Sequence, residues 1–300
     1  MYQDYFSLTE APFSITPDTS YFYAHGHYSE ALNTLLVALR AGEGFIKVTG
    51  EVGTGKTLLC RKLLNTVEDR FVTAYIPNPM LTPYGLQSAV ADELGLDISR
   101  HYGHHQLLKM INNRLLELSA EGKKVVLCID EAQAMPVETM EALRLLTNLE
   151  TEKHKLLQVI LFGQPELDEH LNEKNVRQLK QRITFSYDLK PIDREGMELY
   201  LLHRLRVAGY EGNNLFEKSA MNSLFKASRG IPRLINILAH KSLMSAYGKG
   251  TKHIDNTNMR SAIKDTEDAQ LSNADKHNVA WLAASVSLFS VSLITYFFLR

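Results

Sequence analysis

The sequence predicts an α/β fold: a three-layer domain built on a parallel sheet, then a small all-helical domain and a C-terminal transmembrane helix. Between residues 44 and 191, β-rich runs alternate with amphipathic helical stretches, as expected of a parallel sheet with helices on both faces. After Pro191 the strand signals stop, and the remaining periodic segments are helical. Residues 279–299 then form an apolar run without a charged side chain.

The composition is that of an ordinary globular protein with nearly balanced charge. The 300 residues include 33 Lys and Arg against 34 Asp and Glu, a formal net charge of −1. A chain of this balance has no overall basic field, which disfavours nucleic acid as a partner. Cys60 and Cys128 fall in a predicted helix and a predicted strand, which favours free thiols in a reducing cytoplasm.

The sheet domain is expected over residues 44–191. The strand candidates are residues 44–50, 70–76, 123–130, 156–163 and 183–189. The helical segments between them lie near residues 55–67, 82–94, 104–120 and 136–150. Because the apolar residues of these segments recur at helical spacing, each is predicted to turn one face to the sheet.

The helical domain is expected over residues 192–264. Its three predicted helices are "REGMELYLLHRLRVAG", "FEKSAMNSLFKAS" and "IPRLINILAHKSLMSAYG", and glycines separate them. Residues 265–278 are polar and lack periodicity, which indicates a linker or a solvated helical stalk.

The apolar run 279–299 is expected to cross a membrane. Its 21 residues would span roughly 31 Å as a helix, close to the ~30 Å hydrocarbon core of a bilayer. Trp281 and Tyr296 lie near its ends, and Lys276 and Arg300 lie outside it, as interface residues commonly do. The alternative is an apolar helix buried by a larger assembly, but such a helix normally has a more polar face.

The segment "GEVGTGKT" matches the phosphate-binding pattern G-x-x-x-x-G-K-[ST] and stands between a predicted strand and a predicted helix. Glycines let such a loop wrap a phosphate with its backbone N–H groups, at the positive end of the helix that follows. Lys56 is expected to reach the β- and γ-phosphates, and the Thr57 hydroxyl to ligate Mg²⁺. The predicted nucleotide-binding residues of the loop are Gly50, Glu51, Val52, Gly53, Thr54, Gly55, Lys56 and Thr57.

The segment "VVLCIDEAQ" places Asp130 and Glu131 at the carboxyl end of a buried strand, where open α/β sheets bind their ligands. Asp130 is expected to hold Mg²⁺ with Thr57, and Glu131 to polarise the attacking water, which favours hydrolysis over transfer. No N-K-x-D or T-K-x-D pattern follows in the sequence, so ATP is preferred to GTP.

Four further polar residues are weaker candidates. Gln164 ends the strand 156–163 and could bond the γ-phosphate or the water, or merely cap the turn before Pro165. Arg177 and Arg182 precede the fifth strand; an arginine there could stabilise charge on a phosphoryl group or be an ordinary surface charge. Arg233 follows Pro232 at a helix start and could close over the nucleotide from the helical domain.

The motifs "GEVGTGKT", "CIDEAQ", "LFGQPEL", "QRI" and "GIPR" resemble, in this order, those of AAA+ ATPases. The opening "YFSLTEAPFSITPDTSYFY" and "LRLLTNLE" resemble the general secretion pathway protein A (ExeA) type, closest to its MshM-type members of mannose-sensitive haemagglutinin (MSHA) pilus biogenesis. The resemblance covers roughly residues 1–265. It implies that Gln164 is the sensor-1 residue, Arg182 the first candidate for an arginine finger in a neighbour's site, and Arg233 the sensor-2 arginine.

The resemblance also concerns the N-terminal segment and the partners. Residues 1–43 are expected to pack on the ATPase core, with Pro17 and Asp18 beside the nucleotide base. An arginine finger that acts on a neighbour implies a homo-oligomer, either a ring or another head-to-tail assembly. Because the nucleotide domain needs cytosolic ATP, we expect a single-pass protein of the bacterial inner membrane with that domain in the cytoplasm.

These observations predict a membrane-anchored AAA+ ATPase that uses ATP and Mg²⁺ to assemble or remodel a type IV pilus or a type II secretion machine, with inner-membrane assembly proteins as partners. Two alternatives remain open. One is a DNA-associated AAA+ module of the transposition-helper kind, and the other is a nucleotide-gated scaffold with little hydrolysis.

Overall fold

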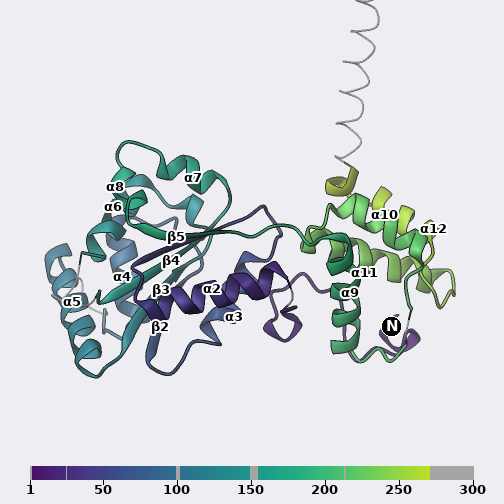
Figure 1. The fold of residues 1–300 in the computed structure, drawn as a ribbon, viewed down its shortest axis with the longest axis horizontal. Helices are drawn as coiled ribbons and strands as arrows, with labels where there is room; N and C mark the ends of the chain where they lie inside the picture. The colour runs from purple at the N-terminus through teal and green to yellow at the C-terminus, as the bar shows by residue number, and fades with distance from the viewer. Residues whose placement is uncertain (1, 25, 99–101, 149–154, 213, 271–300) are drawn as a thin grey trace, which may run out of the picture. The chain divides into compact units, whose positions relative to one another are not determined.

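The computed structural model describes residues 2–24, 26–98, 102–148, 155–212 and 214–270. By its internal contacts the chain divides into two units. The first, here called the sheet unit, comprises Thr16–Ile192. The second, here called the helical unit, comprises, among the described residues, 2–15 together with the chain from Asp193 to residue 270. Figure 1 labels the helices and strands of both.

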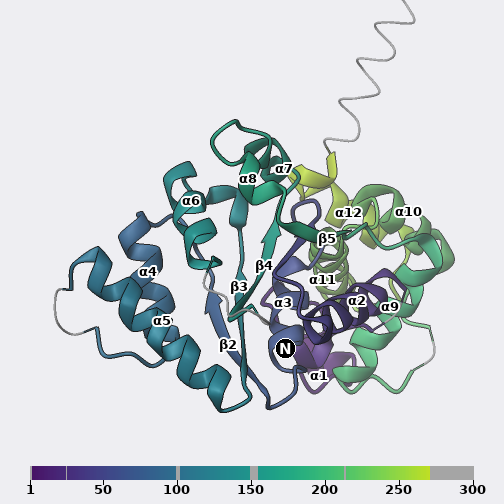
Figure 2. The same cartoon turned by 60° about the vertical axis from the view of Figure 1, so that its left-hand side comes forward.

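The sheet unit contains a five-stranded sheet in which all neighbouring strands are parallel (Figures 1 and 2). Their order is β2-β3-β4-β1-β5. The strands are β1 (Phe45–Thr49), β2 (Phe71–Ile76), β3 (Lys124–Ile129), β4 (Leu157–Gly163) and β5 (Ile183–Asp188). Each lies within one of the five predicted strands, so the predicted parallel α/β sheet is confirmed.

The order of the strands brings three predicted site segments to one edge of the sheet. β4 lies between β3 and β1, with Ile129 paired to Leu161 and Thr49 to Gly163. Because the strands are parallel, the residues that follow β1, β3 and β4 all emerge at the same edge. These are the glycine-rich loop, Asp130 with Glu131, and Gln164.

Helices cover both faces of the sheet (Figure 2). On one face, α4 to α8 pack with the strands in one apolar core. The strands contribute buried side chains such as Phe45, Leu127, Val159 and Leu161 to it. On the other face lie α2 and α3. The helices of this unit are α2 (His27–Ala41), α3 (Lys56–Leu64), α4 (Pro83–Glu93), α5 (His104–Ala120), α6 (Val137–Leu146), α7 (Glu166–Leu171) and α8 (Arg177–Lys180), with the 3₁₀ turns η1 (Thr19–Tyr21) and η2 (Ala132–Ala134).

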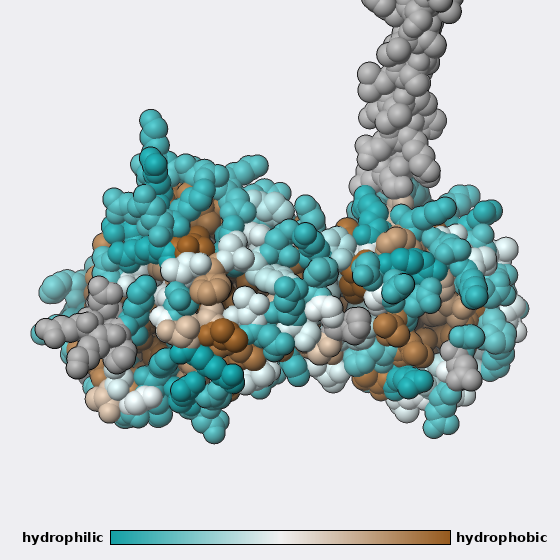
Figure 3. All heavy atoms as spheres, viewed as in Figure 1, coloured by the Kyte–Doolittle hydropathy of each residue, from teal (hydrophilic) through white to brown (hydrophobic). Residues whose placement is uncertain are grey.

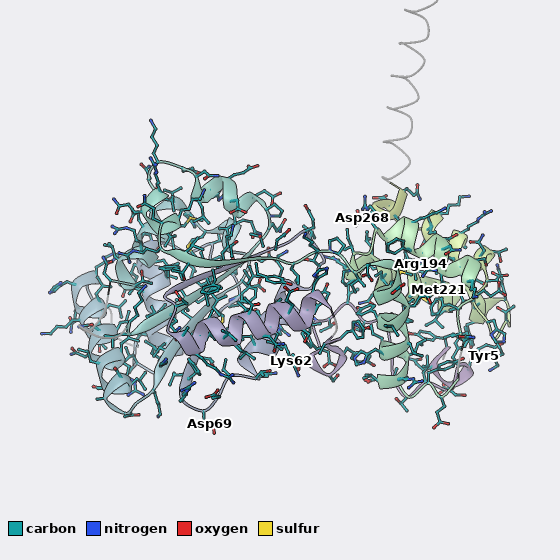
Figure 4. The ribbon with its side chains drawn as sticks, viewed as in Figure 1. Tyr5, Lys62, Asp69, Arg194, Met221 and Asp268 are labelled. Atoms are coloured by element: carbon teal, nitrogen blue, oxygen red, sulfur yellow. The ribbon has the colours of Figure 1, made fainter. Side chains whose placement is uncertain are left out.

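Among its described residues, the helical unit contains the three predicted helices and two that were not predicted. Its helices are α1 (Tyr2–Tyr5), α9 (Arg194–Val207), α10 (Lys218–Ser228), α11 (Pro232–Gly248) and α12 (Asn256–Lys264). Arg194, which is labelled in Figure 4, links α9 to α10, because its guanidinium donates to Asn222 Oδ1 at 2.9 Å. Thr266 and Ala269 are buried, so the packed part of this unit continues past the expected boundary at residue 264.

The N-terminal segment differs from expectation. Residues 1–43 were expected to pack together on the sheet domain, but residues 1–15 group with the helical unit. Arg204, which is 4% exposed, explains the difference, because its guanidinium donates to Pro12 O at 2.6 Å and Ser14 O at 3.2 Å. A buried guanidinium requires acceptors, and this extended segment supplies them.

Within the described residues, no helix is both long enough and apolar enough to cross a membrane. The predicted span 279–299 and most of the linker 265–278 lie outside the described residues. On the face drawn in Figure 3, hydrophilic side chains cover most of the described surface of each unit, and apolar side chains form small separate areas.

Candidate nucleotide site

The glycine-rich loop joins β1 to α3, and its backbone requires glycine at two points. Gly55, which directly precedes α3, has a φ of +93°, a left-handed conformation that favours glycine. At Gly50 a Cβ would lie 2.7 Å from Leu189 O, so only glycine fits there. The loop therefore keeps a tight path that places backbone N–H groups at the start of α3, where anions are bound.

A tyrosine from α2 supports the same loop. The Tyr28 hydroxyl donates to Thr54 O at 2.5 Å, and both residues are buried. Sequence reasoning did not single out Tyr28. Its ring also lies beside Gly55, where a Cβ would be in van der Waals contact with Tyr28 Cε1 at 3.5 Å.

Lys56 opens α3 and is only 6% exposed. Its ammonium donates to Gly50 O at 2.7 Å and to Glu51 O at 3.0 Å, so carbonyl groups of the loop itself fix the position of the charge. Burial lowers the pKa of Lys56, and the carboxylates of Glu131 and Asp130 oppose this shift. A cation held in this way is suited to bind phosphate oxygens.

Thr57 and Asp130 lie in contact. The Thr57 hydroxyl donates to Asp130 Oδ2 at 2.6 Å, while Asp130 Oδ1 accepts from the Glu131 N–H at 2.9 Å. Burial raises the pKa of Asp130, and these two hydrogen bonds lower it. A hydroxyl and a carboxylate are oxygen ligands of the kind that Mg²⁺ prefers, so this pair fits one metal ion.

Glu131 follows at the end of β3 in a left-handed conformation, with φ +50° and ψ +38°. Its Oε2 atom accepts from two amides, Gln133 Nε2 at 2.6 Å and Gln164 Nε2 at 3.2 Å. Non-glycine residues in this conformation concentrate at functional sites. The structure thus brings the two predicted residues Glu131 and Gln164 into contact, and it adds Gln133, which the sequence analysis missed although it lies inside "CIDEAQ".

The two candidate arginines of the 177–182 segment differ in their surroundings. Arg182 donates to Arg144 O at 3.1 Å and to Thr147 Oγ1 at 2.9 Å, and it also contacts Asn148 Oδ1. It therefore satisfies acceptors at the C-terminal end of α6. Arg177, at the start of α8, is exposed.

The remaining predicted residues lie in different units. Arg233 is exposed in the first turn of α11, directly after Pro232, and belongs to the helical unit. Pro17 and Asp18 belong to the sheet unit, where Pro17 O accepts from Arg61 at 3.0 Å and Asp18 caps η1. These two residues help to line a hollow of about 460 Å³ beside α3, together with Thr16, Thr19, Arg61, Leu64 and Asn65.

Comparison with protein families and known proteins agrees with this geometry. A model of the AAA domain matches residues 39–171. General secretion pathway protein A of Aeromonas hydrophila is 43% identical over 254 residues, which are 85% of this chain and 46% of that protein. The chain therefore spans about half the length of this relative.

Solved structures share the fold at low sequence identity. Cdc6p of Pyrobaculum aerophilum has a TM-score of 0.65 at 19% identity, with 85% of this chain and 70% of that chain covered. The ORC2 protein of Aeropyrum pernix, in its ADPNP and ADP complexes, has a TM-score of 0.62 at 17% identity, with 86% and 72% covered. RuvB of Thermotoga maritima has a TM-score of 0.54 at 16% identity, with 81% and 69% covered. With its AAA domain and its extended identity to the secretion protein, the chain is an AAA+ protein of the general secretion pathway protein A type.

Proposed function

We propose that this protein binds ATP at the loop 50–57 and hydrolyses it, with Glu131 as the general base. The contact between Thr57 and Asp130, with Glu131 next in the chain, is the observation that carries the proposal. Lys56 would bind the β- and γ-phosphates, and Gln164 would report the γ-phosphate to Glu131. Mg²⁺, held by Thr57 and Asp130, would neutralise charge on the phosphate oxygens.

Hydrolysis is preferred to a purely gating role because of the carboxylate. Glu131 is anchored through one oxygen, Oε2, by two amides. Its Oε1 atom is then the one that can accept a proton from water. A nucleotide-gated scaffold would need the loop and Asp130 but would have no use for an oriented carboxylate.

We further propose that the protein works as an oligomer in which an arginine completes a neighbour's site. Arg182 is the candidate that the family resemblance favours. To act on a neighbour, its guanidinium would have to leave the end of α6, to which it is bonded. Arg177 is exposed and needs no such release. The geometry therefore favours Arg177 as the arginine that acts on a neighbour, while Arg182 would stabilise the C-terminal end of α6. Arg233 would act from the helical unit as a sensor of nucleotide state.

The cellular role that we propose is assembly or remodelling of an MSHA-like type IV pilus or a secretion machine, from a single-pass anchor at residues 279–299 in the inner membrane. Its support is the 43% identity to a general secretion pathway protein and the apolar run in the sequence. Tethering would raise the effective concentration of the ATPase beside the assembly that it serves.

DNA association is the competing function. It is favoured by the fold of the Aeropyrum pernix ORC1 protein, solved in complex with DNA, at 18% identity and a TM-score of 0.60. The formal charge of −1 offers no basic field of the kind that DNA binding uses. Titration of labelled duplex DNA at two salt concentrations would decide: salt-sensitive binding in the nanomolar range would favour this alternative.

Phosphate release by the purified full-length chain tests the proposal. We expect turnover that depends on Mg²⁺, rises more than linearly with protein concentration, and is lost in Lys56→Ala. Arg177→Ala should lower turnover. Mixing it with Glu131→Gln should restore part of the rate, because a Glu131→Gln subunit can supply Arg177 to the intact Glu131 site of an Arg177→Ala neighbour. Turnover strictly proportional to protein concentration and insensitive to both arginines would contradict the oligomer.

A further inference from the structure

The side chain of Gln133 lies between the Glu131 carboxylate and the end of the neighbouring strand β4. Its Nε2 donates to Glu131 Oε2 at 2.6 Å, and its Oε1 accepts from the Gln164 backbone N–H at 3.0 Å. One amide therefore connects the end of β3 to the end of β4. Both hydrogen bonds use the amide group, so its two ends have separate and defined tasks.

The backbone contact determines which way the amide faces. The Gln164 N–H is a donor only, so the oxygen of Gln133 must face it, and the NH₂ group must then face Glu131. The reverse orientation would set two donors against each other at Gln164 and an oxygen against the Glu131 carboxylate. The main chain of β4 thus orients the donor that binds the carboxylate.

The surrounding chain leaves space for this amide. At Gly163 a Cβ would lie 3.3 Å from Gln133 Oε1 and 2.8 Å from Leu167 Cδ2. A side chain at this position would crowd both the amide and the start of α7. The absence of a side chain at the last residue of β4 is therefore part of the same arrangement.

The second donor to Glu131 is the side chain of Gln164, at a longer 3.2 Å. In the proposed function this side chain senses the γ-phosphate, and a side chain that turns to a phosphate gives up its bond to Glu131. Gln133 has no such second task, since its acceptor end is bound to the main chain. It would keep Oε2 of Glu131 anchored throughout the cycle.

We propose that Gln133 is a positioning residue for hydrolysis: it anchors Oε2 of Glu131 to the end of β4, so that Oε1 faces the attacking water. The inference rests on the proposed role of Glu131 as general base. It concerns the orientation of that carboxylate and leaves nucleotide binding to the loop and Asp130.

Single-turnover hydrolysis of radiolabelled ATP by the full-length chain tests this inference. Gln133→Leu keeps the approximate volume and removes both hydrogen bonds. We expect it to slow hydrolysis by about 10- to 100-fold, because misplacement of a catalytic group by about 1 Å has effects of this size. Affinity for a fluorescent ATP analogue should stay within about twofold of wild type, since binding does not use Gln133.

Two controls separate orientation from general damage. Gln87→Leu removes a glutamine that is 5% exposed and bonded to His104, away from the site, and should leave the rate unchanged. Gln133→Glu keeps the size and the acceptor for the Gln164 N–H but sets a second carboxylate against Glu131. It should fold and bind the ATP analogue, with a lower melting temperature because of the two facing carboxylates, and still hydrolyse slowly.

A double-mutant cycle with Glu131→Ala decides whether Gln133 acts through Glu131. Without the carboxylate, Gln133→Leu should change the residual rate by no more than about twofold. An equal loss in both backgrounds, or a wild-type rate for Gln133→Leu, would overturn the inference. If Glu131→Ala itself hydrolysed ATP at the wild-type rate, the proposed function would fail instead, and the two failures are therefore distinguishable.

Discussion

The Thr57 hydroxyl donates a 2.6 Å hydrogen bond to Oδ2 of Asp130, which joins the first turn of α3 to the end of β3. This contact brings the two predicted metal ligands together, although they are 73 positions apart in the chain. We therefore expect Thr57→Val, which keeps the shape and removes the hydroxyl, to raise the Mg²⁺ concentration needed for half-maximal turnover. Thr57→Ser keeps the ligand and should stay near wild type. Equal Mg²⁺ titration curves for the valine variant and wild type would remove Thr57 from the metal site.

Tyr28→Phe is expected to weaken nucleotide binding and stability together. The change leaves Thr54 O, a buried acceptor in the loop, without its donor. The loss should be about 1 kcal/mol of unfolding free energy, the usual size for one hydrogen bond of this kind. Chemical denaturation with and without ADP measures both effects. Tyr187→Phe is the matched control, because its exposed hydroxyl bonds His27 O and Glu30, outside the loop. Equal effects of the two changes would mean that Tyr28 has no special role in the loop.

The ion pair between Lys47 and Asp168 should matter more than an exposed pair. The side chain of Lys47, in β1, is 11% exposed, and Asp168 belongs to α7. Asp168→Ala would leave a buried ammonium without its partner, and we expect a loss of about 1–3 kcal/mol. Adding Lys47→Met should recover part of that loss.

Glu68→Ala provides the comparison for this pair. It removes two exposed ion pairs of Glu68, one with Arg40 and one with Arg70; the three side chains are 44%, 56% and 46% exposed. We expect a loss below about 1 kcal/mol, as for other surface pairs. If Asp168→Ala cost no more than Glu68→Ala in chemical denaturation, burial of Lys47 would have no energetic consequence.

The helical unit should lose stability in mild acid. Burial lowers the pKa of His240, whose Nδ1 lies 3.1 Å from the Tyr2 hydroxyl, below its ordinary value of 6.5. The unfolded state therefore binds a proton more readily than the folded state. The resulting stability is fully present above pH 6.5 and is lost as the pH falls through the folded-state pKa.

Hydrogen exchange of α11 between pH 5 and pH 8 measures this effect within the unit itself. His240→Gln should flatten the pH dependence. The exposed His253→Gln should leave the profile as in wild type. A profile that is unchanged by His240→Gln would assign the acid sensitivity to other groups.

The left-handed backbone conformation of Glu131 should lower the stability of the fold, and we expect the protein to keep it because activity requires this carboxylate. Glu131→Ala and Glu131→Gly both remove the carboxylate, but only glycine adopts φ +50° without strain. We expect the glycine variant to unfold at a higher temperature than the alanine variant, by a few degrees if the strain is about 1 kcal/mol. Equal melting temperatures, or a lower one for glycine, would mean that the loop relaxes once the side chain is removed.

The strands β1, β3 and β4 could be predicted closely because they are buried and largely apolar. β1 and β4 are buried along their whole length, so each is dominated by apolar and β-branched residues, with Lys47 and Gln158 as the polar exceptions. The residues that follow β1 and β3 were found for a related reason: phosphate and metal chemistry at a strand end uses a few residue types in a strict order.

Other features had no comparable signal. Tyr28 and Gln133 act through hydrogen bonds to Thr54 and Gln164, residues that only the fold brings close. The same is true of residues 1–15. The sequence led us to expect them on the sheet domain, but they supply carbonyl acceptors to the buried Arg204. An arginine candidate such as Arg182 looks the same in sequence whether it is exposed or bonded to a helix end.

The central claim is that Glu131 catalyses hydrolysis while the loop and Asp130 bind the nucleotide. The most direct test is to incubate wild type and Glu131→Gln with radiolabelled ATP and Mg²⁺, isolate the protein-bound nucleotide, and measure its ATP-to-ADP ratio. We predict that wild type retains mostly ADP, and that Glu131→Gln binds ATP with similar affinity but retains it unhydrolysed, with a rate lowered at least about 100-fold. Bound ADP at the wild-type rate in Glu131→Gln would contradict the account.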